Sequence, residues 1–390
     1  MIFFKFLIIN VSNLIFRQNS RVAKMVDKTV FVEGITNYNS INSLKSSITD
    51  IFLKSTDNLD WLSSKDTILL KPALNSYDPY PSTTHPLAIH VISKILSKKC
   101  AKVLIGDQSG LGHVVHDPTG VVRGNTRDNY VKSGMGTTED NFINFESEGW
   151  KEGFIHYQSD HTPSWPNGFY ITKWIEQVDH IINLPRLSTH SQAGVTLGFK
   201  NMVGILRDDS RMEFHANGPF NYFIKNEARG SALKSIDDRS GTFIEKIVEI
   251  NDAIKEKLRL TFFVATKAQA TFGPNQSEVK LGKFGIAKAN IIDLVPGMVF
   301  ASADPVAAES FAFALLKDII KNLPFLSKIY QNLLLFSNDN VTKFDKIPIR
   351  EQPFIRHAID IGLGEMSDHI IYNNVPETFQ HRLRKYLDEN

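Results

Sequence analysis

Short apolar runs alternate with amphipathic stretches along most of the chain, and this alternation predicts strands and helices in turn. The runs that predict strands are 29–32, 67–70, 103–105, 142–145, 154–157, 169–172, 179–184, 260–265 and 298–303. The stretches that predict helices are 40–52, 85–97, 243–258 and 304–317. A strand–helix–strand order implies parallel pairing with right-handed crossovers. The pattern therefore predicts an α/β fold with a mainly parallel, twisted sheet and helices on both faces.

Three further segments show neither pattern. Residues 75–84 are rich in proline and hydroxyl side chains, 111–136 are polar and punctuated by glycine, and 206–241 are charged and irregular. We expect 111–136 to be a long loop over the carboxyl edge of the sheet, and 206–241 to be a candidate lid. Ligands of open α/β sheets bind outside the carboxyl ends of the strands, so the site is expected at that edge.

The pattern also divides the chain into three parts. Residues 25–318 form the predicted α/β domain, and 319–390 a helical C-terminal extension with two or three helical patterns. Residues 1–24 contain an apolar run, but positive charges follow it and no small-residue cleavage site is present. We interpret 1–24 as a leader before the natural start at Met25 or as a short hydrophobic segment, with a signal peptide as the third alternative.

Composition excludes several classes of protein. The 390 residues are 42% hydrophobic and 22% charged, as in ordinary globular proteins, and the net charge of +2 gives no basic field for nucleic acid. Cys100 is the only cysteine, which excludes intrachain disulfides and an iron–sulfur cluster held by this chain, since a cluster needs about four thiolates. No run of about 20 apolar residues follows the leader, so we expect no transmembrane helix and a cytoplasmic location.

The segment after the predicted strand 179–184 concentrates reactive side chains. His190, Lys200 and His215 follow one another there, around a glycine-punctuated apolar stretch. A lysine in an apolar setting can have a lowered pKa and act as a nucleophile, while histidines transfer protons or bind metals. We predict these three residues to be catalytic, with His215 as a candidate metal ligand. For each histidine alone, a structural hydrogen bond is the simpler alternative.

Strand ends and helix starts supply candidate ligand-binding residues. Lys71 ends a strand and could face a carboxylate or phosphate, although a solvated strand end is the simpler alternative. Thr83, Thr84 and His85 precede a helix, where free N–H groups either bind an anion or are only capped. The remaining candidates are Asp107, Ser109, Thr189, Asn201 and Asp304. Asp304 is most simply a helix cap.

Together these motifs resemble the DUF362 family over roughly residues 71–317. The matching segments are Lys71-Pro72, Thr84-His85-Pro86, 106–110, 183–190, 194–197, 200–204, His215, Gly273-Pro274 and 304–307. The family is largely uncharacterised, and many members carry a ferredoxin-type iron–sulfur segment that a chain with one cysteine cannot form. The chain departs from the family pattern at Ala73, Arg186 and Ser188. No anion-binding role is carried over to these three positions.

A more distant resemblance is to the nickel-pincer lactate racemases. In that family a strand ends in a histidine, a glycine-rich run leads to a lysine, and a second histidine follows a loop. The resemblance implies that Lys200 tethers a pyridinium-derived nucleotide, that His215 binds nickel and that His190 is an acid/base. The Asp-x-Thr-Arg-Pro segment of those enzymes is absent here. The sequence therefore leaves the cofactor unknown, with a metal or a nucleotide-type cofactor as the candidates.

The function we expect is that of an enzyme acting on a small anionic metabolite through a Lys/His site. The alternative is a non-catalytic binding protein, a carrier or sensor of a nucleotide, a metal or another anionic ligand. Both functions place a small-molecule ligand at the carboxyl edge of the sheet, and neither fixes the oligomeric state.

Overall fold

A computed structural model describes most of the chain. The described residues are 27–37, 40–100, 102–216, 221–237, 242–276, 279–280, 286–287, 289–334 and 338–389. The predicted leader, 1–24, lies outside them. Among the helices of the described part, none combines the length and the apolar character that crossing a bilayer requires.

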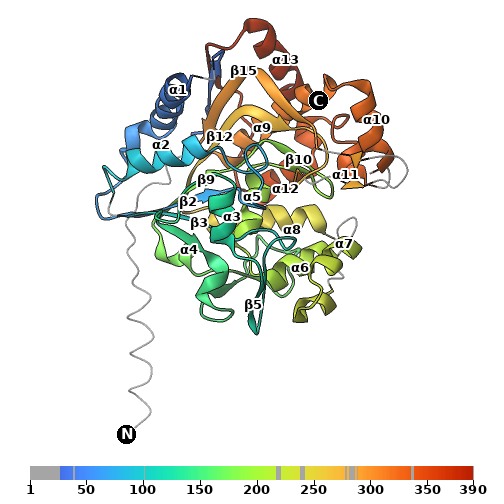
Figure 1. Ribbon diagram of the computed structural model, residues 1–390. Helices are drawn as coiled ribbons and strands as arrows, with labels where there is room; N and C mark the ends of the chain where they lie inside the picture. The colour runs from blue at the N-terminus through green and yellow to red at the C-terminus, as the bar shows by residue number, and fades with distance from the viewer. Residues whose placement is uncertain are drawn as a thin grey trace.

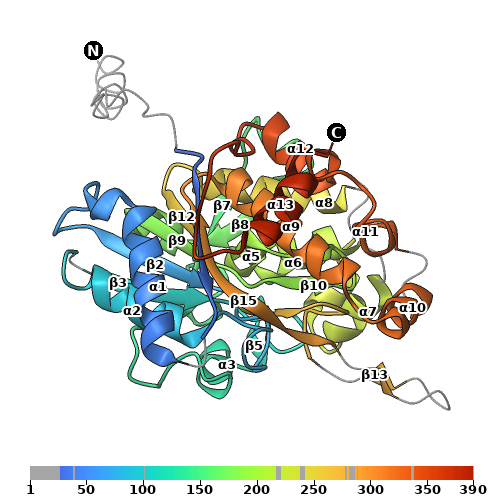
Figure 2. The same cartoon turned by 90° about the horizontal axis from the view of Figure 1, so that it is seen from above.

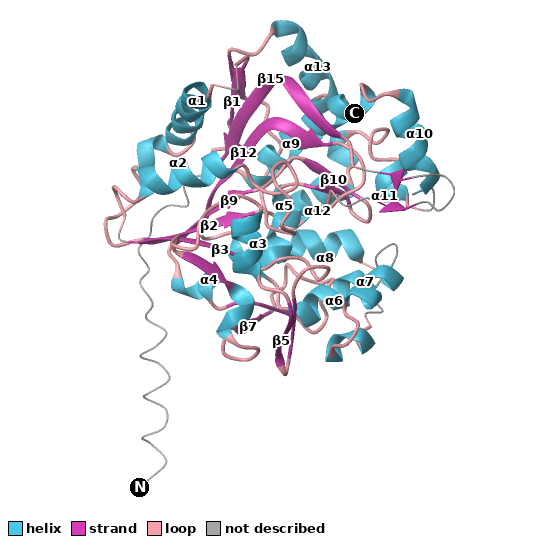
Figure 3. Cartoon of the chain, viewed as in Figure 1, coloured by secondary structure: helices cyan, strands magenta, loops and turns pink. Residues whose placement is uncertain are grey.

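One large sheet runs through the middle of the molecule (Figure 3). Its strands are β1 (Val30–Ile35), β2 (Thr67–Pro72), β3 (Lys102–Asp107), β6 (Phe142–Asn144), β9 (His180–Leu184), β12 (Leu258–Gln269), β15 (Ile291–Ser302) and β16 (Ile370–Asn373). Their order is β16-β1-β15-β12-β9-β2-β3-β6, and β15 alone is antiparallel to its neighbours in this series. The predicted α/β fold with a mainly parallel sheet is confirmed.

Helices cover both faces of the sheet (Figures 1 and 2). One face packs against α1 (Ile41–Lys54), α2 (Pro86–Leu96) and α3 (Thr126–Lys132). The other packs against α8 (Phe243–Glu249), α9 (Pro305–Lys321), α12 (Pro353–Asp360) and α13 (Glu377–Leu387). Side chains of a strand alternate between these two cores, so Leu69 of β2 enters one, whereas Ile68 and Leu70 enter the other.

Polar residues begin the helices near the positions that the sequence predicts. The Ser40 hydroxyl accepts a hydrogen bond from the first turn of α1, and the His85 Nδ1 atom accepts one from the first turn of α2. Pro86 follows at the first helical position, where its missing N–H is not needed. Asp304 caps α9 by accepting from two backbone N–H groups at 2.8 and 3.0 Å.

Two segments predicted to be irregular contain regular structure. Segment 111–136 contains β4 (Val115–Asp117), β5 (Gly120–Arg123) and α3, and segment 206–241 contains α6 (Asp208–Ala216) and α7 (Asn221–Glu227). The expectation that these two segments are irregular is therefore wrong in the described parts of 111–136 and 206–241, and the candidate lid at 206–241 stays a prediction. Helix α6 buries charged residues, including Asp208 and Arg211. It therefore lacks the apolar stripe by which a helix is recognised in sequence.

The remaining strands and helices lie around this sheet. The hairpin β10 (Ser188–His190) and β11 (Gly194–Thr196) joins the sheet through β12, whereas β7 (Phe154–Tyr157) and β8 (Phe169–Thr172) pair with each other as a separate two-stranded sheet. The short elements are α4 (Trp174–Gln177), α5 (Gly198–Asn201), α10 (Phe325–Leu334), α11 (Asp339–Thr342), β13 (Val279–Lys280) and β14 (Ile286–Ala287).

The predicted boundary at 318 falls inside α9, and the C-terminal segment adds β16 to the sheet beside β1. The division into domains stays a prediction.

Candidate functional site

The strand order creates a switch point between β2 and β9. From β2 the chain adds β3 and β6 on one side, and it then returns to add β9 and β12 on the other side. At such a point the connections leave in opposite directions and open a crevice at the carboxyl edge. Segments that follow β2, β3, β9 and β12 line a cavity of about 60 Å³. This volume holds a few water molecules or one small anion.

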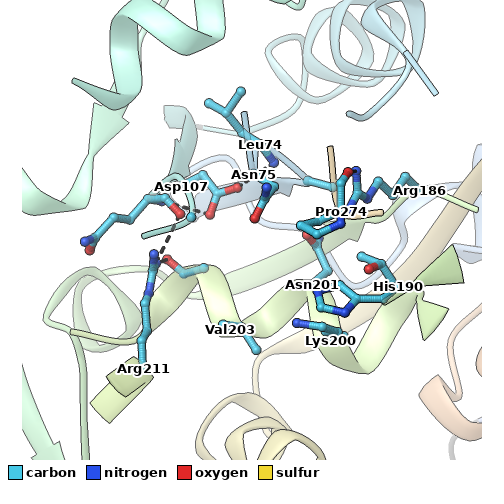
Figure 4. A pocket seen from close by; sticks show the side chains of 15 residues that line it. Leu74, Asn75, Asp107, Arg186, His190, Lys200, Asn201, Val203, Arg211 and Pro274 are labelled. Atoms are coloured by element: carbon cyan, nitrogen blue, oxygen red, sulfur yellow. Dashed lines mark hydrogen bonds between the residues drawn. The ribbon is translucent and has the colours of Figure 1, made fainter. Parts of the chain in front are cut away.

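Polar side chains gather at both ends of this cavity (Figure 4). Arg186, His190 and Lys200 lie at one end, and Asp107 and Arg211 lie at the other. The structure thus brings together four residues predicted to be functional: His190, Lys200, Asp107 and Asn201. It adds two arginines that the sequence analysis did not select.

A tight hairpin fixes the ring of His190. Its Nδ1 atom accepts hydrogen bonds from the backbone N–H groups of Gln192 at 3.0 Å and Ala193 at 3.2 Å. Because this lone pair is occupied, the ring proton resides on Nε2. Burial, followed by the charges of Lys200 and Arg186, lowers the pKa of His190 well below its ordinary value. The ring therefore stays neutral, and the arrangement suits a hydrogen-bond donor better than a general base.

Lys200 lies on the short helix α5 and is 8% exposed. Within the described part of the chain, neither a hydrogen-bond acceptor nor a carboxylate pairs with its Nζ atom. Burial first, and then the nearby charges of Arg186 and Arg211, lowers the pKa of Lys200 to about 7. A substantial fraction of this side chain is therefore a free amine at neutral pH, the form that acts as a nucleophile or a base.

Glu309 of α9 supports the helix that carries Lys200. Its Oε2 atom accepts hydrogen bonds from the backbone N–H groups of Gly198 at 2.6 Å and Phe199 at 3.2 Å. Burial raises the pKa of Glu309 to about 8, against the opposing effect of these two bonds. The sequence analysis missed Glu309, whose only signal is a lone glutamate within an apolar helix.

A buried ion pair lies beneath the other end of the cavity. The Lys71 Nζ atom lies 2.8 Å from Asp107 Oδ1, and it also donates to the Pro72 carbonyl at 2.7 Å and to Asn201 Oδ1 at 3.4 Å. All three protons of this ammonium are therefore used. Asp107 in turn accepts from two backbone N–H groups of the loops that follow β2 and β3. Lys71 thus holds Asp107 and Asn201 in place, and its ammonium is not free for a ligand.

Arg186 is a second buried cation at the cavity with unused hydrogen-bonding capacity. It follows β9 and is 1% exposed, and its Nη1 atom donates to the carbonyls of Ser82 and Pro274. Among the residues that the structure describes, its Nε and Nη2 atoms find no partner, and neither does the hydroxyl of Thr196, a residue that lines the same cavity. Burial lowers the pKa of Arg186 only to about 10, so the guanidinium stays charged at neutral pH. In the sequence, the only signal is an arginine directly after a buried strand.

A family model supports the resemblance seen in the motifs. The model described as "Domain of unknown function (DUF362)" matches residues 68–314, which is more than half of the chain. The chain belongs to the DUF362 family. Comparison with curated proteins and with solved structures finds no match.

In this DUF362 protein, the residues around the start of α2 bond to the protein itself. The Thr84 hydroxyl accepts from the Ala73 N–H and donates to the Leu184 carbonyl, which ties β2 to β9. The Thr83 hydroxyl donates to a loop carbonyl, and the His85 ring caps the helix. None of these three side chains lines the described cavity. These three side chains therefore bond within the protein, as the alternative of simple capping expects.

Three further predicted ligand-binding residues lie outside the cavity wall. Ser109 accepts a hydrogen bond from Asn129, and Thr189 donates to the Phe272 carbonyl. Asp304 lies at the opposite edge of the sheet, because β15 runs antiparallel to β12 and ends where the parallel strands begin. Its carboxylate caps α9 and accepts from the Glu365 N–H.

His215 lies on α6, next to the cavity but not in its wall. Its Nδ1–H donates to the Arg211 carbonyl at 2.7 Å, which leaves Nε2 as an acceptor. Burial, followed by the charge of Lys200, lowers the pKa of His215 to about 3. In the described ranges, no group of three or more His, Cys, Asp or Glu side chains could hold a metal. A nucleotide needs a pocket of roughly 300 Å³ or more, so these residues do not fit a tethered nickel–nucleotide cofactor.

Lys200→Met is expected to stabilise the protein, by about 2 kcal/mol more at about pH 6 than at about pH 8.5. The folded-state pKa of about 7 lies below the unfolded value of 10.5. Below pH 7 the lysine is charged in both states, so the wild type bears the full cost of burying the charge. Above pH 7 the folded state releases its proton first, and the wild type regains stability.

Urea unfolding at the two pH values measures this difference. Lys151→Met, at an exposed position, is the matched control and should show no such pH dependence. An advantage of Lys200→Met that is equal at both pH values would contradict the lowered pKa of Lys200.

Proposed function

We propose that this DUF362 protein is an enzyme that binds a small anionic metabolite in the cavity and acts on it through Lys200. The proposal rests chiefly on the unused donors of Arg186, whose Nε–H and Nη2–H have no partner although the residue is buried. Buried polar groups normally have partners, and an incompletely satisfied buried charge is costly. A bound anion would supply the missing acceptors.

The chemistry of the same end of the cavity favours a carboxylate or a phosphate. The Nε–H and Nη2–H groups form one edge of the guanidinium, which matches two oxygens of such an anion. Lys200 and the Nε2–H of His190 add two further donors. Asp107, the carboxylate that lines the cavity, is already paired with Lys71. Asp78 acts on Arg186 through its charge but does not line the cavity, so Arg186 and Lys200 leave this end positively charged, as an anion site requires.

The pKa of Lys200 favours an enzyme over a carrier or sensor. Binding an anion is served best by a fully charged ammonium, whereas a pKa of about 7 provides a free amine for chemistry. The carrier remains the second candidate, because the donors of Arg186 and His190 suit binding alone equally well. The cytoplasmic location and the absence of a nucleic-acid partner stay predictions.

Acetate, pyruvate and inorganic phosphate are the probes that test this proposal by calorimetry. We expect at least one of them to bind to the wild type, and Arg186→Met to weaken that binding about ten- to a hundredfold, the loss of charge-assisted hydrogen bonds worth about 1.5–3 kcal/mol. Arg207→Met is the matched control. Arg207 is also buried, but its guanidinium bonds to Asp209 and it does not line the cavity.

Equal binding to Arg186→Met and to the wild type would refute the anion site, and so would the absence of binding of every probe. NMR spectroscopy of the recovered ligand separates the two classes of function. Conversion of the ligand by the wild type but not by Lys200→Met supports an enzyme, whereas a ligand that binds and is recovered unchanged supports a carrier.

A further inference from the structure

We propose that Lys200 forms an imine with the oxo group of a 2-oxo acid whose carboxylate is held by Arg186. This inference rests on the proposed function, because it uses the same anion site. It goes further in naming the class of ligand and the covalent bond that forms.

The composition of one end of the cavity carries the inference. Within the described residues, Arg186 has two nitrogens, Nε and Nη2, without a partner, and Lys200 has an unpaired Nζ atom; both side chains line the same cavity of about 60 Å³. A ligand of that size holds its second functional group one or two bonds from the carboxylate. A 2-oxo acid has its electrophilic carbon bonded directly to the carboxylate, so an anion on Arg186 brings this carbon to Lys200.

Two neutral donors line the same cavity and suit the oxygen of the oxo group. His190 presents its Nε2–H, because its Nδ1 atom is occupied by two backbone N–H groups. The Thr196 hydroxyl is buried without a partner. Hydrogen bonds from such donors stabilise the negative charge that develops on a carbonyl oxygen during nucleophilic attack. The three groups that imine formation needs are therefore present together: an anion clamp, an amine and oxygen donors.

The step balances without an oxidant or a reductant. The lone pair of Lys200 Nζ attacks the oxo carbon, and the π electrons of the C=O bond move to oxygen. A proton passes from the attacking nitrogen to this oxygen and gives a carbinolamine. The nitrogen lone pair then forms the C=N bond as the C–O bond breaks, and the oxygen leaves as water with a proton from solvent. One amine, one 2-oxo acid and one proton thus give a protonated imine and one water.

Other lysines of the described chain do not offer this combination. Lys71 is also buried, but its three protons bond to Asp107, Pro72 and Asn201, and it does not line the cavity. Lys246 is held by Glu213 at 2.8 Å. Lys200 is the lysine that lines the cavity, and burial near two arginines keeps part of it as a free amine.

Reductive trapping tests the imine in the full chain. The protein is incubated with pyruvate or 2-oxobutyrate and cyanoborohydride, and then analysed by intact mass spectrometry and peptide mapping. With pyruvate we expect one adduct per chain, with the mass of pyruvic acid less one oxygen atom, on the peptide that contains Lys200. Lactate has the carboxylate but no oxo group, and should give no adduct.

Two variants locate the bond and the clamp. Lys200→Met, which is expected to fold with increased stability, should lose the adduct completely. Arg186→Met keeps Lys200 and should need about ten- to a hundredfold more pyruvate for the same yield, because it loses the carboxylate contact.

The outcomes separate this inference from the proposed function. Binding of acetate, phosphate or pyruvate with no trapped 2-oxo acid would overturn the imine and leave the anion site standing. An adduct spread over exposed lysines, or one that persists in Lys200→Met, would also overturn it. Failure of every anion to bind would remove the proposed function, and the imine inference with it.

Discussion

Replacing Asp107 with alanine is expected to lower the free energy of unfolding by about 3–5 kcal/mol, the usual cost of leaving one member of a buried ion pair unpaired. Lys71 and Asp107 lie 2.8 Å apart, with side-chain exposures of 0% and 3%. Burial lowers the pKa of Lys71 and raises that of Asp107, against their mutual attraction. Without the carboxylate, the ammonium keeps the cost of burial and loses the attraction that offsets it.

Urea unfolding of Asp107→Ala, Lys71→Met and the double variant checks this prediction. The double variant removes both charges, so it should recover part of the stability that Asp107→Ala loses. Asp128→Ala, at an exposed position of α3, serves as the control and should change stability little. If the two single effects are small and simply add, the pair does not contribute in this way.

Glu309→Gln is expected to gain stability relative to the wild type as the pH rises from about 5 to about 8, by about 3.5 kcal/mol over this window. The folded-state pKa of Glu309, about 8, lies above its ordinary value of 4.5, because the carboxyl is buried. Between these values the folded state holds a proton that the unfolded state has released. The wild type therefore loses stability as the pH rises, and glutamine, which does not titrate, removes this loss.

The measurement is the midpoint of urea unfolding at several pH values, converted to free energy with a common slope. Glu152→Gln, at an exposed position, is the control and should follow the wild type at every pH. A constant difference between Glu309→Gln and the wild type across the window would show that Glu309 titrates as an ordinary glutamate.

The local sequence pattern was enough to predict the central strands of the sheet and the starts of two helices. The apolar runs of β2 and β9, and the caps Ser40 and Asp304 before α1 and α9, are local signals that tertiary structure did not override. The start of β15 was missed because Pro296 interrupts it, and proline normally argues against an inner strand. The short, half-exposed β16 was missed because a strand that depends on a distant partner leaves little local signal.

The site was predicted less completely, for a related reason. His190 and Lys200 stood out as reactive residue types after a strand, and they do line the cavity. Arg186 and Thr196 did not stand out, because their importance comes from hydrogen-bonding groups that the rest of the fold leaves unpaired. Thr84 is the opposite case. Its hydroxyl accepts a hydrogen bond from the Ala73 N–H and donates one to the Leu184 carbonyl, and the sequence does not mark these two residues as its partners. Whether a polar side chain serves the fold or a ligand is decided by partners that sequence spacing does not reveal.

The position of β1 between β15 and β16 sets an order on folding during synthesis. A ribosome releases β1 before the other strands, yet its partners lie at 291–302 and 370–373. The strands β2, β3 and β9 can pair with one another much earlier, while both edges of β1 still present open backbone groups. Such edges are templates for pairing with another chain. The nascent protein is therefore exposed to misassembly at β1 until its C-terminal segment emerges and closes that edge.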